Sequence, residues 1–286
     1  MPVLVVVMWM LSVFVVAEPV LAQGPACRPE GRLMPLAELP EASGIVASRT
    51  TKGRVWLHND SGAPVLFAFD QDGKSAGRLT VSGARVEDWE ALAIGPCGSG
   101  SCLFVGDIGD NEAKRKQITI YRVPEPANAS GSATAEVFTA TYPDGAHDAE
   151  ALMVAPDGTI VIVTKGDTGP VAAYRFPKSL QPNTTMRLEK IGGALAAKAG
   201  NDKITDGAFS SDGQWVALRT KTAVTFYRAA DFLKGDFSNG RRVDLTGLRE
   251  PQGEAIAFGS GDRVYVAGEG GGKKQPGTLG LLSCQP

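Results

Sequence analysis

The sequence predicts an all-β fold built from five copies of one repeat, and three observations carry this prediction. A short motif recurs as Asp88-Trp89-Glu90-Ala91-Leu92-Ala93, Asp148-Ala149-Glu150-Ala151-Leu152 and Gln252-Gly253-Glu254-Ala255-Ile256-Ala257, with more degenerate copies at Thr205–Phe209 and Glu41–Ile45. The motif positions Ser43, Glu90, Glu150, Asp206 and Glu254 lie 47, 60, 56 and 48 residues apart, which suits four-stranded units. The chain also contains 35 Gly and 18 Pro, which indicate many turns.

Each repeat is predicted to form four antiparallel strands, of which the motif is the first. Turns such as Pro156-Asp157-Gly158 and Ser211-Asp212-Gly213 lead into the second strands. These second strands are apolar runs, as expected for strands covered on both faces: Arg54–His58, Leu103–Asp107, Thr159–Lys165, Gln214–Arg219 and Arg263–Ala267. The third strands carry Tyr-Arg pairs that begin at Tyr121, Tyr174 and Tyr227. More polar fourth strands are predicted at Gly77–Val81, Glu136–Tyr142, Met186–Ile191 and Arg241–Leu245, with Pro124–Ala135 as a loop.

The fifth unit has no fourth strand, because the chain stops at Pro286 soon after the third. Gly31-Arg32-Leu33-Met34 resembles the fourth-strand segment Gly77-Arg78-Leu79-Thr80 and precedes the first unit. An N-terminal strand that completes the last sheet would close a ring and protect its edge. We therefore predict a five-bladed β-propeller with four antiparallel strands per blade. A β-sandwich or two small β-domains would not explain why the two ends complement each other.

The two ends of the chain also bear on its location. Residues 1–22 read as a secretory signal peptide, with an apolar run from Val3 to Val16 and a cleavage site at Val20-Leu21-Ala22. No Lys or Arg precedes the apolar run, so a membrane anchor is the alternative. We expect residues 23–286 to form a single propeller domain, secreted or periplasmic, with no membrane span in the mature chain.

Four cysteines remain in the mature chain, and an even count in an exported protein suggests disulfides. Three connectivities are possible. Position favours Cys97–Cys102, which closes a small loop between two strands, and Cys27–Cys284, which joins the two ends of the domain.

Composition excludes several classes of function. The formal net charge of -2 argues against a nucleic-acid partner. The sequence contains two His, no G-x-S-x-G elbow and no glycine-rich nucleotide-binding motif, which disfavours a Ser-His-Asp hydrolase or a nucleotide-binding enzyme. We expect a monomer that binds a small-molecule or polymer ligand.

The first strand of a propeller blade lines the central channel and begins where the second strand ends. The motif acids and the residues that close the second strands are therefore predicted to meet at one mouth of the channel. Hard oxygen donors in this number suit Ca²⁺. The predicted metal ligands are Glu90, Asp107, Asp110, Asn111 and Asp206. The predicted ligand-binding residues are His58, Asp60, Trp89, His147 and Glu269.

Two alternatives remain open at this mouth. Lys165 and Arg219 would form a salt-bridge network with the carboxylates and plug the channel without any metal. Trp89 would pack in the channel wall instead of stacking against a ligand.

Three segments together resemble a group of exported bacterial propeller proteins of unsettled activity: Asp88-Trp89-Glu90-Ala91, Val105-Gly106-Asp107-Ile108-Gly109-Asp110-Asn111 and Tyr121-Arg122-Val123-Pro124. The Glu-Ala-Leu/Ile repeat is also similar, more loosely, to alkaline β-propeller phytases and gluconolactonase-like propellers. Those families bind Ca²⁺ through acids at the channel mouth and hydrolyse phosphate esters or lactones. Few Lys or Arg occupy the matched positions here, which argues against a phytate-like polyanion.

The sequence therefore predicts an exported propeller that binds a ligand, and Ca²⁺, at an acidic channel mouth. The alternative is a Ca²⁺-dependent hydrolase of phosphoesters or lactones. In that mechanism Glu150 or Glu254 would activate water, and Lys165 or Arg219 would stabilise the developing charge.

Overall fold

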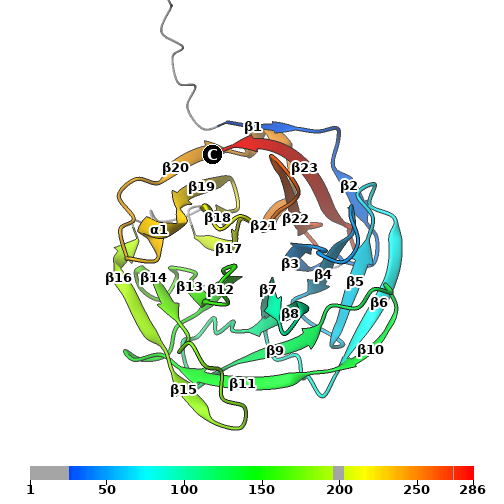
Figure 1. Cartoon of the computed structure of the whole chain (residues 1–286). Coiled ribbons are helices and arrows are strands. Elements are labelled where there is room, and N and C mark those ends of the chain that lie inside the picture. The colour runs from blue at the N-terminus through cyan, green and yellow to red at the C-terminus, as the bar shows by residue number, and fades with distance from the viewer. Residues whose placement is uncertain (1–25, 196–202, 273) are drawn as a thin grey trace, which may run out of the picture.

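The computed structural model describes residues 26–195, 203–272 and 274–286, and it shows five β-sheets arranged in a ring (Figure 1). The predicted signal peptide, residues 1–22, lies outside the described residues. The five sheets are the blades of a β-propeller, so the predicted fold class is confirmed.

Each blade runs outward from the centre of the ring through four antiparallel strands, and we number the blades in chain order. Blade 1 contains β3 (Ala42–Ala47), β4 (Val55–Asn59), β5 (Val65–Phe69) and β6 (Ser75–Ser82). Blade 2 contains β7 (Trp89–Cys97), β8 (Gly100–Asp107), β9 (Ile118–Pro124) and β11 (Glu136–Thr141). Blade 3 contains β12 (Ala149–Val154), β13 (Ile160–Thr164), β14 (Val171–Arg175) and β16 (Glu189–Leu195). Blade 4 contains β17 (Ile204–Phe209), β18 (Trp215–Thr220), β19 (Ala223–Arg228) and β20 (Arg241–Asp244).

Blade 5 is completed by both ends of the chain, as predicted. It contains β21 (Gln252–Phe258), β22 (Arg263–Glu269) and β23 (Gly277–Gln285), and β23 pairs antiparallel with β1 (Ala26–Pro29) and β2 (Met34–Leu36). The predicted position of the N-terminal strand was wrong. Residues 31–33 form the turn between β1 and β2, where Gly31 adopts a left-handed φ of 89°.

Both predicted disulfides are present. Cys27 lies opposite Cys284 in the β1–β23 ladder and is bonded to it, so the closure of the ring is covalent. Cys97–Cys102 joins β7 to β8 across their hairpin.

Two further strands run along the rim and were not predicted. β10 (Gly131–Thr134), which lies in the segment predicted as a loop, pairs in parallel with β6 of blade 1. β15 (Thr185–Arg187) pairs in parallel with β11 of blade 2, so the single strand predicted at Met186–Ile191 is in fact β15 followed by β16. Both extra strands cover the outer edge of the preceding blade, which would otherwise be unpaired.

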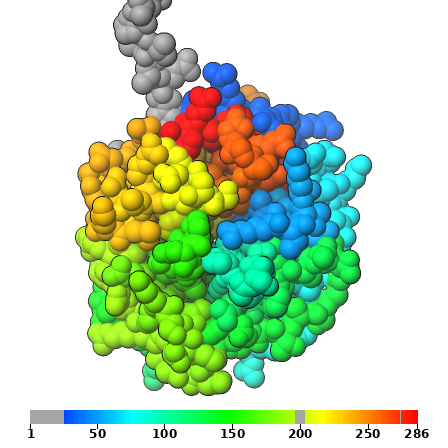
Figure 2. Space-filling view, viewed as in Figure 1, coloured from blue at the N-terminus to red at the C-terminus, as the bar shows by residue number. Residues whose placement is uncertain are grey.

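The core lies between blades, because the second strands are apolar on both faces. Five clusters of buried side chains fill the five gaps between neighbouring blades. Apolar residues of the five first strands also fill one half of the channel and leave a cavity of about 30 Å³, roughly the room for one water. The blades meet at the centre of the ring in the space-filling view (Figure 2).

Helical structure among the described residues consists of α1 (Ala229–Phe232) and a 3-10 turn at Thr246–Leu248. In this part of the chain, no helix has the length and apolar character that crossing a bilayer requires.

Candidate ligand-binding site at the channel mouth

The first strands carry a β-bulge at the same place in all five blades. Pairing with the second strand skips one residue in each blade, and a bulge of this kind re-aims the extra side chain. The five bulge residues are Ser43, Glu90, Glu150, Thr205 and Glu254. We call these residues the bulge ring.

Two hydroxyl contacts confirm that the bulge residues are equivalent. The Ser43 hydroxyl donates to the carbonyl oxygen of Glu90 at 2.9 Å, and the Thr205 hydroxyl donates to the carbonyl oxygen of Glu254 at 2.7 Å. Each bond therefore joins the bulge of one blade to the bulge of the next. Blade 4 places Thr205 in the ring, so Asp206 is displaced by one residue from the position that the motif predicted.

Strand pairing places a second ring of side chains beside the first. In blades 1 to 4 the residue before the bulge pairs with Asn59, Asp107, Thr164 and Thr220, and Gly253 of blade 5 pairs with Gly268. The second ring consists of the residues that follow these partners in the sequence: Asp60, Ile108, Lys165, Lys221 and Glu269. We call the two rings together the channel mouth.

Lys165 lies at the centre of the acidic part of the mouth. Its Nζ contacts Glu150 Oε1 directly and lies 3.4 Å from Asp148 Oδ2 and 3.5 Å from Asn111 Oδ1. Burial alone lowers the pKa of Lys165, but the charge and hydrogen bond of Glu150 outweigh burial and raise that pKa. Lys165 therefore remains an ammonium ion at neutral pH.

The bulge glutamates are buried, and burial disfavours their charged form. Burial raises the pKa of Glu150 to about 8, against the opposing effect of Lys165. Burial and the neighbouring charge of Glu150 raise the pKa of Glu90 well above its usual value, and burial also raises the pKa of Glu254. After burial, the charge of Glu254 also raises the pKa of Glu150, so Glu90, Glu150 and Glu254 lie near one another.

The opposite side of the mouth, between blades 5 and 1, is acidic as well. Burial, followed by the charges of Glu41 and Glu269, raises the pKa of Asp60 to about 6. Burial and the charge of Glu254 raise the pKa of Glu269. Lys221 is the nearby cation, with its Nζ 3.9 Å from Glu254 Oε1.

The segment Asp107–Asn111, predicted as the heart of a calcium site, is organised by Arg115 instead. Arg115 Nη1 lies 2.9 Å from Asp107 Oδ1, and the backbone N–H of Arg115 donates to Asp110 Oδ2 at 2.7 Å. Asp107 also accepts the backbone N–H groups of Glu87 and Asp88, at 3.1 and 3.2 Å. The guanidinium group thus supplies the positive charge that the sequence assigned to a metal ion.

His58 and Arg219 occupy equivalent positions, opposite Gly44 and Asp206, and both are fully buried between blades. Arg219 Nη1 donates to the carbonyl oxygen of Ala255 in blade 5 at 2.6 Å, and Nη2 pairs with Glu250. Neither side chain reaches the surface of the mouth, so the roles predicted for them in ligand binding and catalysis do not fit their positions.

Asp206 is also fully buried, and its carboxylate accepts the backbone N–H groups of Gly207 and Ile256 at 2.7 and 2.8 Å. Trp89 is buried in the wall, where its Nε1 donates to the carbonyl oxygen of Arg85 at 2.9 Å. The wall-packing alternative for Trp89 therefore describes its position. Asp206 and Trp89 both stabilise the wall around the mouth.

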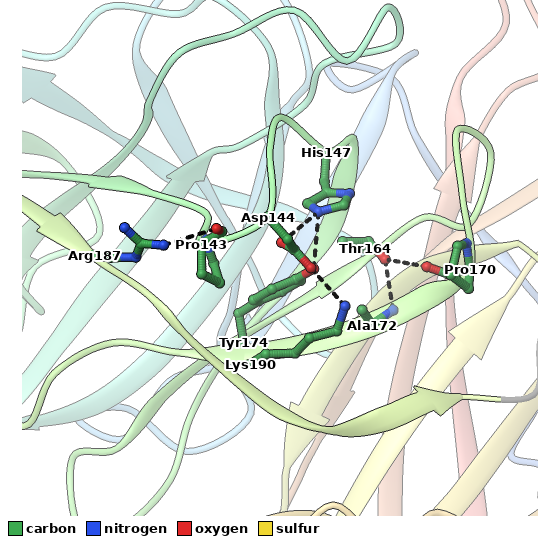
Figure 3. Close-up of polar contacts among 9 residues, drawn as sticks. All are labelled: Pro143, Asp144, His147, Thr164, Pro170, Ala172, Tyr174, Arg187 and Lys190. Carbon is green, nitrogen blue, oxygen red and sulfur yellow. Dashed lines mark hydrogen bonds and ion pairs between the residues drawn. The ribbon is translucent and has the colours of Figure 1, made fainter.

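His147 lies away from the channel, in a polar cluster that ties a loop to the face of blade 3 (Figure 3). Its Nε2 lies 3.0 Å from Asp144 Oδ1 and 3.0 Å from the Tyr174 hydroxyl. Lys190 Nζ completes the cluster at 2.7 Å from Asp144. The hydrogen bonds of Lys190, His147 and Tyr174 overcome the effect of burial and lower the pKa of Asp144 to about 2.

The structure thus brings Glu90, Glu150, Glu254, Lys165, Asp60 and Glu269 together at the mouth. The sequence-based site prediction missed Arg115, Lys221 and the two bulge hydroxyls. Lys221 was detectable, because Thr220-Lys221 repeats Thr164-Lys165 at the same strand end. Within the described residues, no group of three or more His, Cys, Asp or Glu is arranged to hold a metal ion.

No family model and no curated protein sequence matches the chain. Among solved structures, the PQQ-bound aldose sugar dehydrogenase of Streptomyces coelicolor is similar, with a TM-score of 0.53, 10% identity, and coverage of 91% of this chain and 98% of that one. A gluconolactonase of Xanthomonas campestris has a TM-score of 0.46 and 11% identity, with 90% and 96% of the two chains covered. The calcium-binding protein regucalcin of Agrobacterium tumefaciens has a TM-score of 0.46 and 13% identity, with 89% and 95% covered. These likenesses show the propeller fold alone.

Proposed function

We propose that this protein is an exported ligand-binding propeller whose acidic channel mouth binds a cationic small molecule or polymer. One observation carries the proposal: the bulges aim Glu90, Glu150 and Glu254 into one space, beside Asp60 and Glu269. Lys165 and Lys221 offset part of this negative charge. A cleft lined by excess charge of one sign attracts and holds ligands of the opposite sign.

In a more specific form of this proposal, the cation that binds at the mouth is Ca²⁺. The side chains that surround Lys165 Nζ, namely Asp148, Glu150 and Asn111 with Glu90 beside them, supply the oxygen donors that Ca²⁺ prefers. Asp148 Oδ2 accepts no hydrogen bond among the described residues, although its side chain is 1% exposed. The chemistry of these oxygen donors supports a hard cation as the ligand, whereas Asp107 and Asp110 already bind Arg115.

Location in an oxidising compartment is part of the proposal. Two disulfides use all four cysteines, and disulfides persist in secreted and periplasmic proteins. A monomer is expected, because the propeller closes on itself through β1 and β23.

The test is thermal unfolding of the purified protein at low ionic strength with Ca²⁺, Mg²⁺ or 1,4-diaminobutane, each compared with a chelator-treated sample. A cation that binds the folded state at one hundred times its Kd stabilises it by about 2.7 kcal/mol, which raises the Tm by several degrees. Glu90→Gln should reduce the rise, whereas Asp157→Asn in an exposed turn should preserve it. Identical melting curves under all conditions, together with no heat of binding in calorimetry, would reject the proposal.

A hydrolase is the second candidate, and the position of Glu150 favours it. Burial raises the pKa of Glu150 to about 8, which brings this carboxyl group into the range suited to general acid–base work. Lys165 beside it would stabilise developing negative charge on a phosphoester or lactone, and Glu254 is the second carboxyl group at the mouth. Hydrolysis of generic substrates that is lost in Glu150→Gln but retained in Asp157→Asn would establish this function.

A further inference from the structure

The ammonium group of Lys165 sits in a cage of oxygen atoms contributed by three side chains. Glu150 belongs to the first strand of blade 3, Asp148 precedes that strand, and Asn111 follows the second strand of blade 2. Carboxylate and amide oxygens are the donors that a hard cation prefers in proteins. Lys165 thus occupies a cation position built by its neighbours.

The fit between Lys165 and this cage is incomplete on one side. A charge-assisted N–H···O⁻ bond is about 2.7–2.9 Å long, but Asp148 Oδ2 lies 3.4 Å from Lys165 Nζ. That oxygen is buried and accepts no hydrogen bond among the described residues. A buried carboxylate oxygen without a donor is costly, so the cage retains an unsatisfied acceptor while Lys165 fills it.

We propose that Lys165 is a built-in competitor at this position, so that a divalent cation enters the cage by displacing the Lys165 ammonium toward solvent. The inference rests on the proposed function, a cation-binding mouth, and adds how that site is regulated. Lys165 can leave, because its side chain is 19% exposed and has four rotatable methylene groups. A tethered competitor is present at high effective concentration, so the affinity of the wild type for a free ion is weak.

The first test compares Lys165→Met with the wild type by titration calorimetry with Ca²⁺ at low salt. Removing the competing charge should tighten Ca²⁺ binding by at least about tenfold, because like charges a few ångströms apart repel strongly. Lys74→Met is the control: Lys74 is exposed in the turn that joins β5 to β6, outside the mouth, and this change should alter affinity by less than about twofold. Adding Asp148→Asn to Lys165→Met should abolish the gain.

The second test uses the unmodified protein, so it remains informative if Lys165→Met fails to fold. Amine-reactive labelling, resolved by mass spectrometry of peptides, reports how accessible each lysine is. Saturating Ca²⁺ should increase the labelling of Lys165 several-fold and leave that of the exposed turn lysine Lys74 unchanged.

The outcomes separate this inference from the proposed function. If the wild type binds cations, but Lys165→Met binds Ca²⁺ no more tightly and Lys165 labelling is unaffected by the ion, displacement is wrong and the binding function stands. A gain that survives Asp148→Asn would place the ion elsewhere and also overturn the inference. If neither the wild type nor Lys165→Met responds to any cation, both the inference and the proposed function fail.

Discussion

The environment of a residue, and not its type alone, decides what the residue does. His58 and Arg219 occupy equivalent positions in the strand ladders of blades 1 and 4. The sequence suggested a ligand-binding role for His58 and a catalytic role for Arg219, because both are polar and end a predicted second strand. Both are fully buried beneath the next blade. A Cβ on Gly44 would lie 2.4 Å from His58 Nε2, so this buried position depends on a glycine in the neighbouring strand.

The acids of the mouth were predictable in kind but not in every position. Glu90, Glu150 and Glu254 recur in the motif, and the structure places all three on bulges. Asp206 was assigned to the same ring because its neighbours resemble the motif, but Thr205 is the bulge residue. The position of a bulge depends on how two strands pair, and a local motif does not predict that pairing. Arg115 was missed for a similar reason, because its partners precede it across an irregular loop.

His58 predicts a specific dependence of stability on acid. Burial lowers its pKa to about 4, and its Nδ1 must carry the hydrogen because it lies 2.9 Å from the carbonyl oxygen of Asn59. The unfolded state, with an ordinary His pKa of about 6.5, binds the proton more readily. The stability from neutral His58 is therefore complete above about pH 6.5 and falls as the pH drops, and the loss amounts to about 3 kcal/mol by pH 4.

Urea unfolding at several pH values between 7.5 and 4 measures this effect. His58→Gln should lose less stability than the wild type over that interval, although it is less stable at neutral pH. Parallel pH profiles for the wild type and His58→Gln would show that His58 does not sense acid.

Strands were predicted well where burial shapes their sequence and poorly where it does not. The second strands are continuous apolar runs, and each lies within a residue or a few residues of its predicted bounds. The outer strands are polar, and their pairing depends on the neighbouring blade, so β10 was taken for a loop and β15 was merged with β16. Whether these rim strands form depends on partners that are distant in sequence, and local composition does not indicate those partners.

Contacts between elements of different blades also include a buried carboxylate that no motif predicted. Glu125 directly follows β9 of blade 2 and is 8% exposed. It accepts hydrogen bonds from the Ser48 hydroxyl at 2.5 Å, the Arg49 backbone N–H at 3.2 Å, Trp56 Nε1 at 3.3 Å and the Ser101 hydroxyl at 2.6 Å. The first three donors belong to blade 1, so Glu125 joins the two blades.

Glu125→Ala should lower the free energy of unfolding by about 3 kcal/mol, because it leaves the buried Trp56 indole N–H and several part-buried donors without an acceptor. Glu136→Ala is the control: it removes an exposed carboxylate paired with Arg122 and should cost less than about 1 kcal/mol. Equal losses in chemical denaturation of the two variants would contradict a joining role for Glu125.

At the scale of the whole molecule, the closed ring was predictable because the fifth repeat lacks a fourth strand and a segment before the first repeat can supply it. Five first strands surround one channel, so a single acidic space results from residues spread over the chain. The geometry of that space depends on the ring being closed, since blade 5 and blade 1 contribute Glu254, Glu269 and Asp60 from opposite ends of the sequence.

The closure therefore predicts unequal effects for the two disulfides. Cys27–Cys284 spans a sequence separation of 257 residues, whereas Cys97–Cys102 spans 5. In the chain-entropy model, the long loop stabilises the folded state by up to about 5 kcal/mol and the short loop by about 2 kcal/mol. Changing Cys27 and Cys284 to Ser should thus lower the Tm more than changing Cys97 and Cys102 to Ser, as measured by calorimetry. The β1–β23 ladder remains in both variants, so the ring should still form, but its closing strand should exchange amide hydrogens faster when the long-range disulfide is absent. If the two double variants melt at the same temperature, β-strand pairing and core contacts hold the ring closed without help from the disulfide.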